Sequence, residues 1–115
     1  LTQQGDSRTM MGVPPADATA AAIAAGADIV GTNCGNGMER MIEIVKQIRA
    51  AAPDTPILVH ANAGLPQLVD GVDVFPDTPE EMAGMTAAIV AAGANIIGGC
   101  CGTTPAHIKA MKEAL

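Results

Sequence analysis

Three cysteines are the residues of this chain whose type and spacing could do chemistry. Cys34 stands alone between asparagine and glycine, whereas Cys100 and Cys101 are adjacent and have glycines on both sides. An odd number of cysteines, two of them adjacent, does not suit the disulfide framework of a small secreted domain. We therefore expect reduced thiols, which serve either as small buried apolar residues or as metal ligands.

An internal repeat relates the two cysteine positions to each other. The segment AGADIVG at 25–31 reappears as AGANIIG at 92–98, and the same offset places Cys34 over Cys101. Each copy is a short apolar run that leads into a cysteine motif. The repeat therefore predicts that both cysteine motifs follow equivalent strands.

The elements that must position the cysteines are short apolar runs, which predict strands buried on both faces. Such strands are typical of parallel sheets covered by helices. The predicted strands are 28–33, 57–61 and 95–99, with a weaker candidate at 8–12 ahead of them.

Helical patterns separate these runs. The predicted helices are 16–25, 37–52, 78–92 and 104–115. The third begins with Thr78-Pro79-Glu80-Glu81, a capping box with proline at the first helical position. Strands that alternate with helices predict right-handed crossovers and a parallel sheet. A complete TIM barrel takes about 250 residues, so 115 residues predict an α/β fold, the (βα)4 half of a (βα)8 barrel; a small open α/β sheet is the competing fold.

The C-terminal ends of parallel strands lie at one edge of the sheet, where such folds place their sites. Cys34 lies at one of these ends, Cys100 and Cys101 lie at another, and Asn62 follows the strand between them. Adjacent residues of a regular strand point to opposite faces, so Cys100 and Cys101 can face one ion only where the backbone turns sharply. The flanking glycines permit that turn.

Three thiolates are too few for a closed structural zinc site but suit a catalytic one, which leaves its fourth position to water or substrate. Sulfur ligands favour zinc over magnesium or calcium. A substrate thiol in the open position would lose its proton, and we expect its sulfur to attack an electrophilic carbon such as a methyl group. The alternative is that all three cysteines are core residues at strand ends.

Two histidines and one long loop are further candidates. His60 shares a strand face with Asn62, and we interpret it as a satisfied core residue rather than a ligand or base. His107 lies early in the last predicted helix, where we expect it on the surface. The segment 63–77 is a long loop that either closes the site or forms a small packed hairpin.

Composition excludes several classes of function. A net charge of −6, from 6 Lys+Arg against 12 Asp+Glu, argues against nucleic acid as a partner. With 49% hydrophobic and 16% charged residues the chain should build a core. The uncharged stretch 82–106 is broken by glycines, so we expect no membrane span. The polar N-terminal residues carry no secretory signal, and with reduced thiols they predict a cytoplasmic protein cut from a longer chain.

The cysteine motifs resemble the zinc-binding signatures of the homocysteine S-methyltransferase domain family. The segments that carry this resemblance are Gly31-Thr32-Asn33-Cys34-Gly35, Asn62-Ala63-Gly64-Leu65-Pro66 and Gly98-Gly99-Cys100-Cys101-Gly102-Thr103-Thr104-Pro105-Ala106-His107-Ile108. The resemblance covers the whole chain and implies that residues 1–115 are the fifth to eighth βα units of a homocysteine-binding barrel. It implies zinc on Cys34, Cys100 and Cys101, homocysteine sulfur in the open position, Asn62 beside the metal and substrate, and no catalytic residue beyond the zinc site.

Within the family, the segments 9–13, 35–37 and 74–81 are most similar to the homocysteine-binding module of cobalamin-dependent methionine synthases. This implies a methyltransferase that makes methionine, with methylcobalamin as donor on another domain or chain. Its partners would be the missing N-terminal half-barrel and domains for cobalamin and methyltetrahydrofolate. Betaine- or S-methylmethionine-dependent relatives share the cysteines, and a non-catalytic zinc-binding half-barrel or assembly module is the other alternative. Ala61 stands where many relatives have proline.

Overall fold

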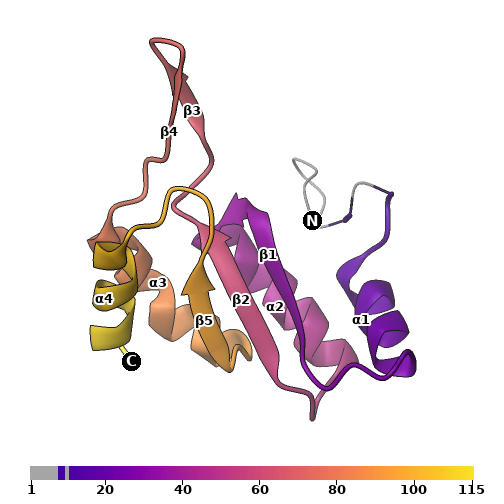
Figure 1. Ribbon diagram of the computed structural model, residues 1–115. Coiled ribbons are helices and arrows are strands. Elements are labelled where there is room, and N and C mark those ends of the chain that lie inside the picture. Colours follow the sequence, from indigo (N-terminus) through magenta and orange to yellow (C-terminus); the bar gives the residue numbers. More distant parts are fainter. Residues whose placement is uncertain (1–7, 10) are drawn as a thin grey trace.

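The computed structural model describes residues 8–9 and 11–115 and shows a parallel sheet with helices packed behind and beside it (Figure 1). The strand order is β1-β2-β5, and both pairings are parallel. The strands of this sheet are β1 (Val30–Gly37), β2 (Ile57–Asn62) and β5 (Ile96–Gly99). The helices are α1 (Pro15–Ala24), α2 (Met38–Ala51), α3 (Pro79–Ala92) and α4 (Pro105–Glu113). An antiparallel pair, β3 (Gln67–Val69) and β4 (Val72–Val74), stands apart from the sheet.

The order of strands and helices predicted from 28 onward is confirmed. The strand predicted at 8–12 is wrong for the residues that the structure describes there, and Met10 lies outside them. Gly12 donates its backbone N–H to the carbonyl oxygen of Thr9 at 2.9 Å, and the Arg8 guanidinium bonds the Gly12 carbonyl oxygen at 2.9 Å. With Gly12 at φ +82°, these bonds close a tight turn instead of an extended segment.

The core lies on the helix side of the sheet. Along β2, Ile57, Val59 and Ala61 are fully buried, in the alternation expected of a strand with one covered face. α2 packs against β1 and β2 and supplies the largest share of the core. Its buried side chains recur at helical spacing: Met38, Met41, Ile44, Val45 and Ile48.

The opposite face of the sheet carries Leu58, His60 and Asn62 from β2. In Figure 1 this face is turned toward the viewer, and none of the helices described crosses it. Helices along one side of a short parallel sheet are the arrangement of one part of a (βα)8 barrel, in which the uncovered face would line the barrel interior. None of the helices in the described ranges is long and apolar enough to cross a membrane.

The loop predicted at 63–77 contains the β3–β4 hairpin, which projects beyond the C-terminal ends of the strands (Figure 1). The predicted alternative of a packed hairpin is half right. The hairpin forms, but all six of its strand residues are exposed. The hairpin lies at the same end of the sheet as Cys34, in the last part of β1, and Cys100, which follows β5.

Candidate metal centre

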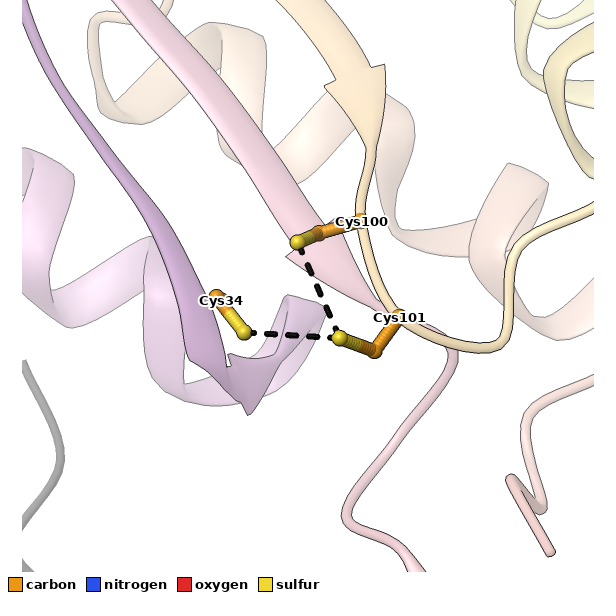
Figure 2. A group of neighbouring side chains, drawn as sticks. All are labelled: Cys34, Cys100 and Cys101. Carbon is orange, nitrogen blue, oxygen red and sulfur yellow. Dashed lines mark hydrogen bonds between the residues drawn. The ribbon is translucent and has the colours of Figure 1, made fainter.

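The structure brings the three cysteine sulfurs together at the C-terminal ends of β1 and β5 (Figure 2). Cys34 Sγ lies 3.6 Å from Cys101 Sγ, and Cys100 Sγ lies 3.9 Å from Cys101 Sγ. All three sulfurs lie within 4.8 Å of one another. Within the described ranges this is the one group of cysteine, histidine and acidic side chains with the spacing of metal ligands.

A break in the strand aims Cys34 at the cluster. The pairing of β1 with β2 runs from Asn33↔His60 directly to Gly37↔Asn62, so extra residues of β1 bulge out at this point. Cys34 adopts φ +57° and Gly35 φ +73°. A non-glycine residue in this left-handed region costs roughly 1 kcal/mol, which the surrounding strand pairs must offset. The bulge turns the Cys34 thiol away from the direction that a regular strand would give it.

The second cysteine motif is a tight turn after β5. Cys100 donates its N–H to the carbonyl oxygen of Ala61 at 2.8 Å, and Ala63 donates to the carbonyl oxygen of Cys101 at 2.9 Å. The Thr103 hydroxyl bonds the Cys100 carbonyl oxygen at 2.7 Å, and Gly102 has φ +79°. These bonds bend the backbone so that both adjacent thiols reach the same cluster, as the flanking glycines predicted.

Asn62 is a supporting residue of this turn. Its side chain is 4% exposed, and its Oδ1 accepts the backbone N–H of Cys101 at 3.1 Å. The residue therefore supports the second cysteine motif, while its predicted contact with a substrate stays a prediction.

The neighbouring thiols shift the pKa values of Cys34 and Cys101 in opposite directions. The hydrogen bond from Cys101, and then the N–H of Gly35, lower the pKa of Cys34. The bonds and charges of Cys34 and Cys100 raise the pKa of Cys101 to about 11. These opposite shifts describe one shared titration, in which Cys34 ionises first and Cys101 keeps its proton to donate. Gathering three thiolates requires a positive charge among them, as a bound metal ion supplies.

The expectation that His107 lies on the surface is wrong, because the residue is 7% exposed. Its Nδ1 accepts the backbone N–H of Thr104 at 3.1 Å, and its Nε2 lies 2.8 Å from the carbonyl oxygen of Asp77. His107 occupies the third helical position after an N-cap threonine, where glutamate usually completes a capping box. The Thr-x-x-His spacing was the signal in the sequence that could have revealed this role.

His60 lies outside the thiol cluster. Its ring passes over Gly98 on the neighbouring strand, where an added Cβ would come within 2.5 Å of the ring carbon Cδ2. The glycine thus makes room for the ring on the uncovered face of the sheet. His60 is half-buried on this face and is not the buried core residue that was expected, while its predicted lack of a ligand or base role stays a prediction.

All of residues 1–115 match the family model described as Homocysteine S-methyltransferase. The chain belongs to this family. The resemblance predicted from the cysteine motifs is therefore confirmed, including its similarity to the methionine synthase type.

Two relatives are methionine synthases from mycobacteria. The chain is 34% identical over 116 residues to that of Mycobacterium leprae, which covers 100% of this chain and 10% of the relative. It is 40% identical over 91 residues to that of Mycobacterium tuberculosis, which covers 78% of this chain and 8% of the relative. The chain thus spans about a tenth of the length of these relatives.

Solved structures of a homocysteine methyltransferase, MmuM from Escherichia coli, share the fold. The apo form superposes with a TM-score of 0.74 at 27% identity, covering 98% of this chain and 38% of that one. The oxidized form gives 0.69 at 28% identity, covering 97% and 34%. The predicted fold class is confirmed: the chain is an α/β unit with parallel strands that corresponds to part of a barrel.

Proposed function

We propose that this chain is the zinc-bearing part of a homocysteine S-methyltransferase of the methionine synthase type, which methylates homocysteine to methionine. The observation that carries this proposal is the cluster of three thiols at the C-terminal ends of parallel strands. Its support is membership of the family and similarity to methionine synthases along the whole chain.

The donor set fits zinc. Three sulfurs within 4.8 Å of one another, with no fourth cysteine, histidine or carboxylate beside them in the described ranges, match a catalytic site with three protein ligands. Cys34, Cys100 and Cys101 would hold the ion. When bound, zinc would take the homocysteine sulfur at its open position and keep it as a thiolate near neutral pH.

The residues of the chain prepare this site before any ligand arrives. The hydrogen bond from Cys101 and the N–H of Gly35 lower the pKa of Cys34, which favours its thiolate, and the bulge in β1 fixes the direction of its side chain. Asn62 holds the Cys101 backbone and so fixes the direction of the second motif. Preorganised ligands of this kind keep a reacting sulfur in one place and lower the entropic cost of transfer.

In the reaction, the sulfur of homocysteine loses a proton and gains a methyl group. Homocysteine gives up its thiol proton to solvent, its sulfur forms a bond to the methyl carbon, and the donor–methyl bond breaks with its electron pair remaining on the donor. The donor proposed here is methylcobalamin on another domain or chain, supported by the similarity to methionine synthases. S-methylmethionine or betaine would replace it in a relative of the other type.

The remaining parts of the barrel complete the enzyme. We assign residues 1–115 to the fifth to eighth βα units on the basis of the resemblance to the family. In the part of the chain that the structure describes, one sheet face is uncovered and β1 and β5 lie at the edges of the sheet, so further strands can adjoin it. A first half of the barrel would supply these strands, together with groups for the amino and carboxylate ends of homocysteine. Reduced thiols suit the cytoplasm, where we place the protein.

The experiment compares zinc content and methionine formation in the full-length protein that carries these residues. Cys34→Ser should lower zinc from near one per chain to near zero and abolish methionine formation from homocysteine. Ala87→Ser, on the exposed side of α3, is the matched control and should retain both. Full zinc in Cys34→Ser would refute the metal site. Zinc binding by the unmodified protein without methionine formation would favour the non-catalytic assembly module instead.

A further inference from the structure

His107 has a hydrogen-bonding group that the capping of α4 does not use. Helices α3 and α4 begin with the same pattern, a threonine cap followed by proline and, two positions later, Glu81 or His107. Glu81 accepts the backbone N–H of Thr78 at 2.9 Å. His107 accepts that of Thr104 at 3.1 Å through its Nδ1. Glutamate is the usual residue for this bond, so capping by itself does not call for an imidazole.

The second ring nitrogen of His107 carries the proton. A backbone N–H can only donate, so Nδ1 accepts from Thr104 and the neutral ring has its N–H at Nε2. Nε2 lies 2.8 Å from the carbonyl oxygen of Asp77 and donates to it. A carboxylate at this position would have no hydrogen for that oxygen, whereas the imidazole serves both sides.

The backbone of Asp77 connects His107 to the cysteine turn. Asp77 donates its N–H to the carbonyl oxygen of Ala63 at 3.0 Å, and Ala63 donates its N–H to the carbonyl oxygen of Cys101 at 2.9 Å. Ala63 is fully buried and His107 is 7% exposed, so water does not readily replace these bonds. Three successive hydrogen bonds therefore lead from the imidazole to the backbone of a thiol-bearing residue.

These bonds close a ring with the polypeptide itself. Cys101 and His107 lie in one short segment, the first in the cysteine turn and the second in the first turn of α4. The Phe75 ring packs against Gly102 of the same segment, where it leaves no space for a Cβ. The cysteine turn is thus held from two directions, by β2 through Asn62 and by α4 through His107.

We propose that His107 is a positioning residue of the metal centre, which fixes the Cys101 backbone through Asp77 and Ala63; this rests on the proposed function. Ala63 begins the segment that carries the exposed hairpin, Asp77 ends it, and the bond between them closes it. Without the bond from His107 the Asp77 end is free to move, and the Cys101 carbonyl oxygen loses a fixed donor. Metal affinity depends on the direction of each ligand, so zinc binding should weaken.

The test separates the two bonds of His107 in the full-length protein. His107→Asn keeps an oxygen acceptor near the Nδ1 position for Thr104 but is too short to reach Asp77. His107→Gln places an amide N–H near the Nε2 position and keeps the bond to Asp77. Lys109→Gly, at an exposed position of α4, weakens the helix without touching either bond and is the matched control.

Competition with a chelator of known affinity measures zinc binding by these variants. We expect His107→Asn to lower the affinity about three- to tenfold, less than the roughly 10- to 100-fold typical of residues that bond a metal ligand directly. The affinities of His107→Gln and Lys109→Gly should stay within about twofold of that of the unmodified protein.

Equal affinities of His107→Asn and the unmodified protein would overturn the proposal, as would an equal fall in Lys109→Gly or in His107→Gln. Hydrogen exchange gives a second measurement that needs no zinc. The amides of Ala63 and Asp77 should exchange faster in His107→Asn than in His107→Gln, and unchanged exchange in His107→Asn would refute the series of bonds. Absence of zinc from the unmodified protein would refute the proposed function instead, and hydrogen exchange would still decide whether His107 holds the cysteine turn.

Discussion

The side chain of Asn62 accepts the backbone N–H of Cys101 at 3.1 Å, so the end of β2 holds the cysteine turn that follows β5. The two residues are far apart in the sequence: Asn62 is the last residue of β2, and Cys101 lies two residues after the end of β5. This bond leaves the Cys101 thiol free to face Cys34. Mutation of such partners, which orient ligands without binding the metal, commonly lowers metal affinity by roughly 10- to 100-fold, and we expect a change of that order here.

Asn62→Ala should therefore weaken zinc binding by about tenfold or more, because the Cys101 backbone N–H loses its acceptor. Competition with a chelator of known affinity measures the change. Asn62→Asp keeps an oxygen acceptor at the same position and serves as the matched variant, which should retain the geometry of the turn. An affinity in Asn62→Ala equal to that of the unmodified protein would show that the turn is held without this bond.

Gly102→Ala should destabilise the cysteine turn for two reasons. The residue has φ +79°, and an added Cβ would meet the Phe75 ring. Gly71 has a similar φ of +78° with nothing within 4 Å of an added Cβ, so Gly71→Ala measures the backbone cost by itself. We expect Gly71→Ala to cost about 1 kcal/mol of unfolding free energy and Gly102→Ala about 2–4 kcal/mol. Urea denaturation compares them, and equal costs would show that Phe75 moves aside freely.

The sequence predicted the parts of the fold that local pattern determines. Apolar runs located β1, β2 and β5, and Thr78 with Glu81 marked the start of α3, whose reciprocal cap bonds measure 3.2 and 2.9 Å. The internal repeat indicated that the motifs of Cys34 and Cys101 follow equivalent strands, and the shared C-terminal edge of a parallel sheet indicated that they lie close together. These features depend on residues close together in the chain or on the regular geometry of parallel strands.

Features that depend on distant contacts escaped prediction. His107 is buried because its Nε2 reaches the carbonyl oxygen of Asp77, a residue 30 positions away in the sequence. The bulge that aims Cys34 depends on its pairing with β2. The cysteine motif names Cys34 as a candidate ligand, but only the folded chain gives the direction of its side chain.

Asp77 should make stability depend on pH. Burial, followed by the charges of Glu81 and Glu39, raises the pKa of its carboxyl above the ordinary value. A raised carboxyl pKa means that the folded state holds the proton more tightly than the unfolded state. The unfolded chain therefore ionises first as pH rises, and stability falls between the ordinary and the raised pKa, then stays lower above it.

Asp77→Asn removes this ionisation and should raise the stability of the folded protein at neutral pH. The advantage should disappear below the ordinary carboxyl pKa, where Asp77 is protonated in both states. Asp54→Asn, at an exposed position between α2 and β2, is the control for a simple change of net charge. Denaturation at several pH values measures the difference. A constant gap between the Asp77 variant and the unmodified protein at every pH would contradict the shift.

Arg49 joins the ends of two helices to the start of a strand. Its Nη1 bonds the carbonyl oxygens of Ala52 at 2.9 Å and Thr55 at 2.7 Å. Its Nη2 bonds the carbonyl oxygen of Gly93 at 2.6 Å and Asn95 Oδ1 at 2.7 Å. The planar guanidinium satisfies carbonyls that the last turns of α2 and α3 leave without partners.

Arg49→Lys should therefore destabilise the protein although the charge is kept, because an ammonium group cannot reach acceptors on both sides at once. We expect a loss of about 2–3 kcal/mol of unfolding free energy, the range for hydrogen bonds to a charged group. Lys46→Ala on the same helix removes an exposed ion pair to Glu43 of 3.8 Å and should cost less than about 1 kcal/mol. Equal losses in the two variants would mean that Arg49 acts through its charge alone, and that the fork of hydrogen bonds does not hold α3 against the start of β2.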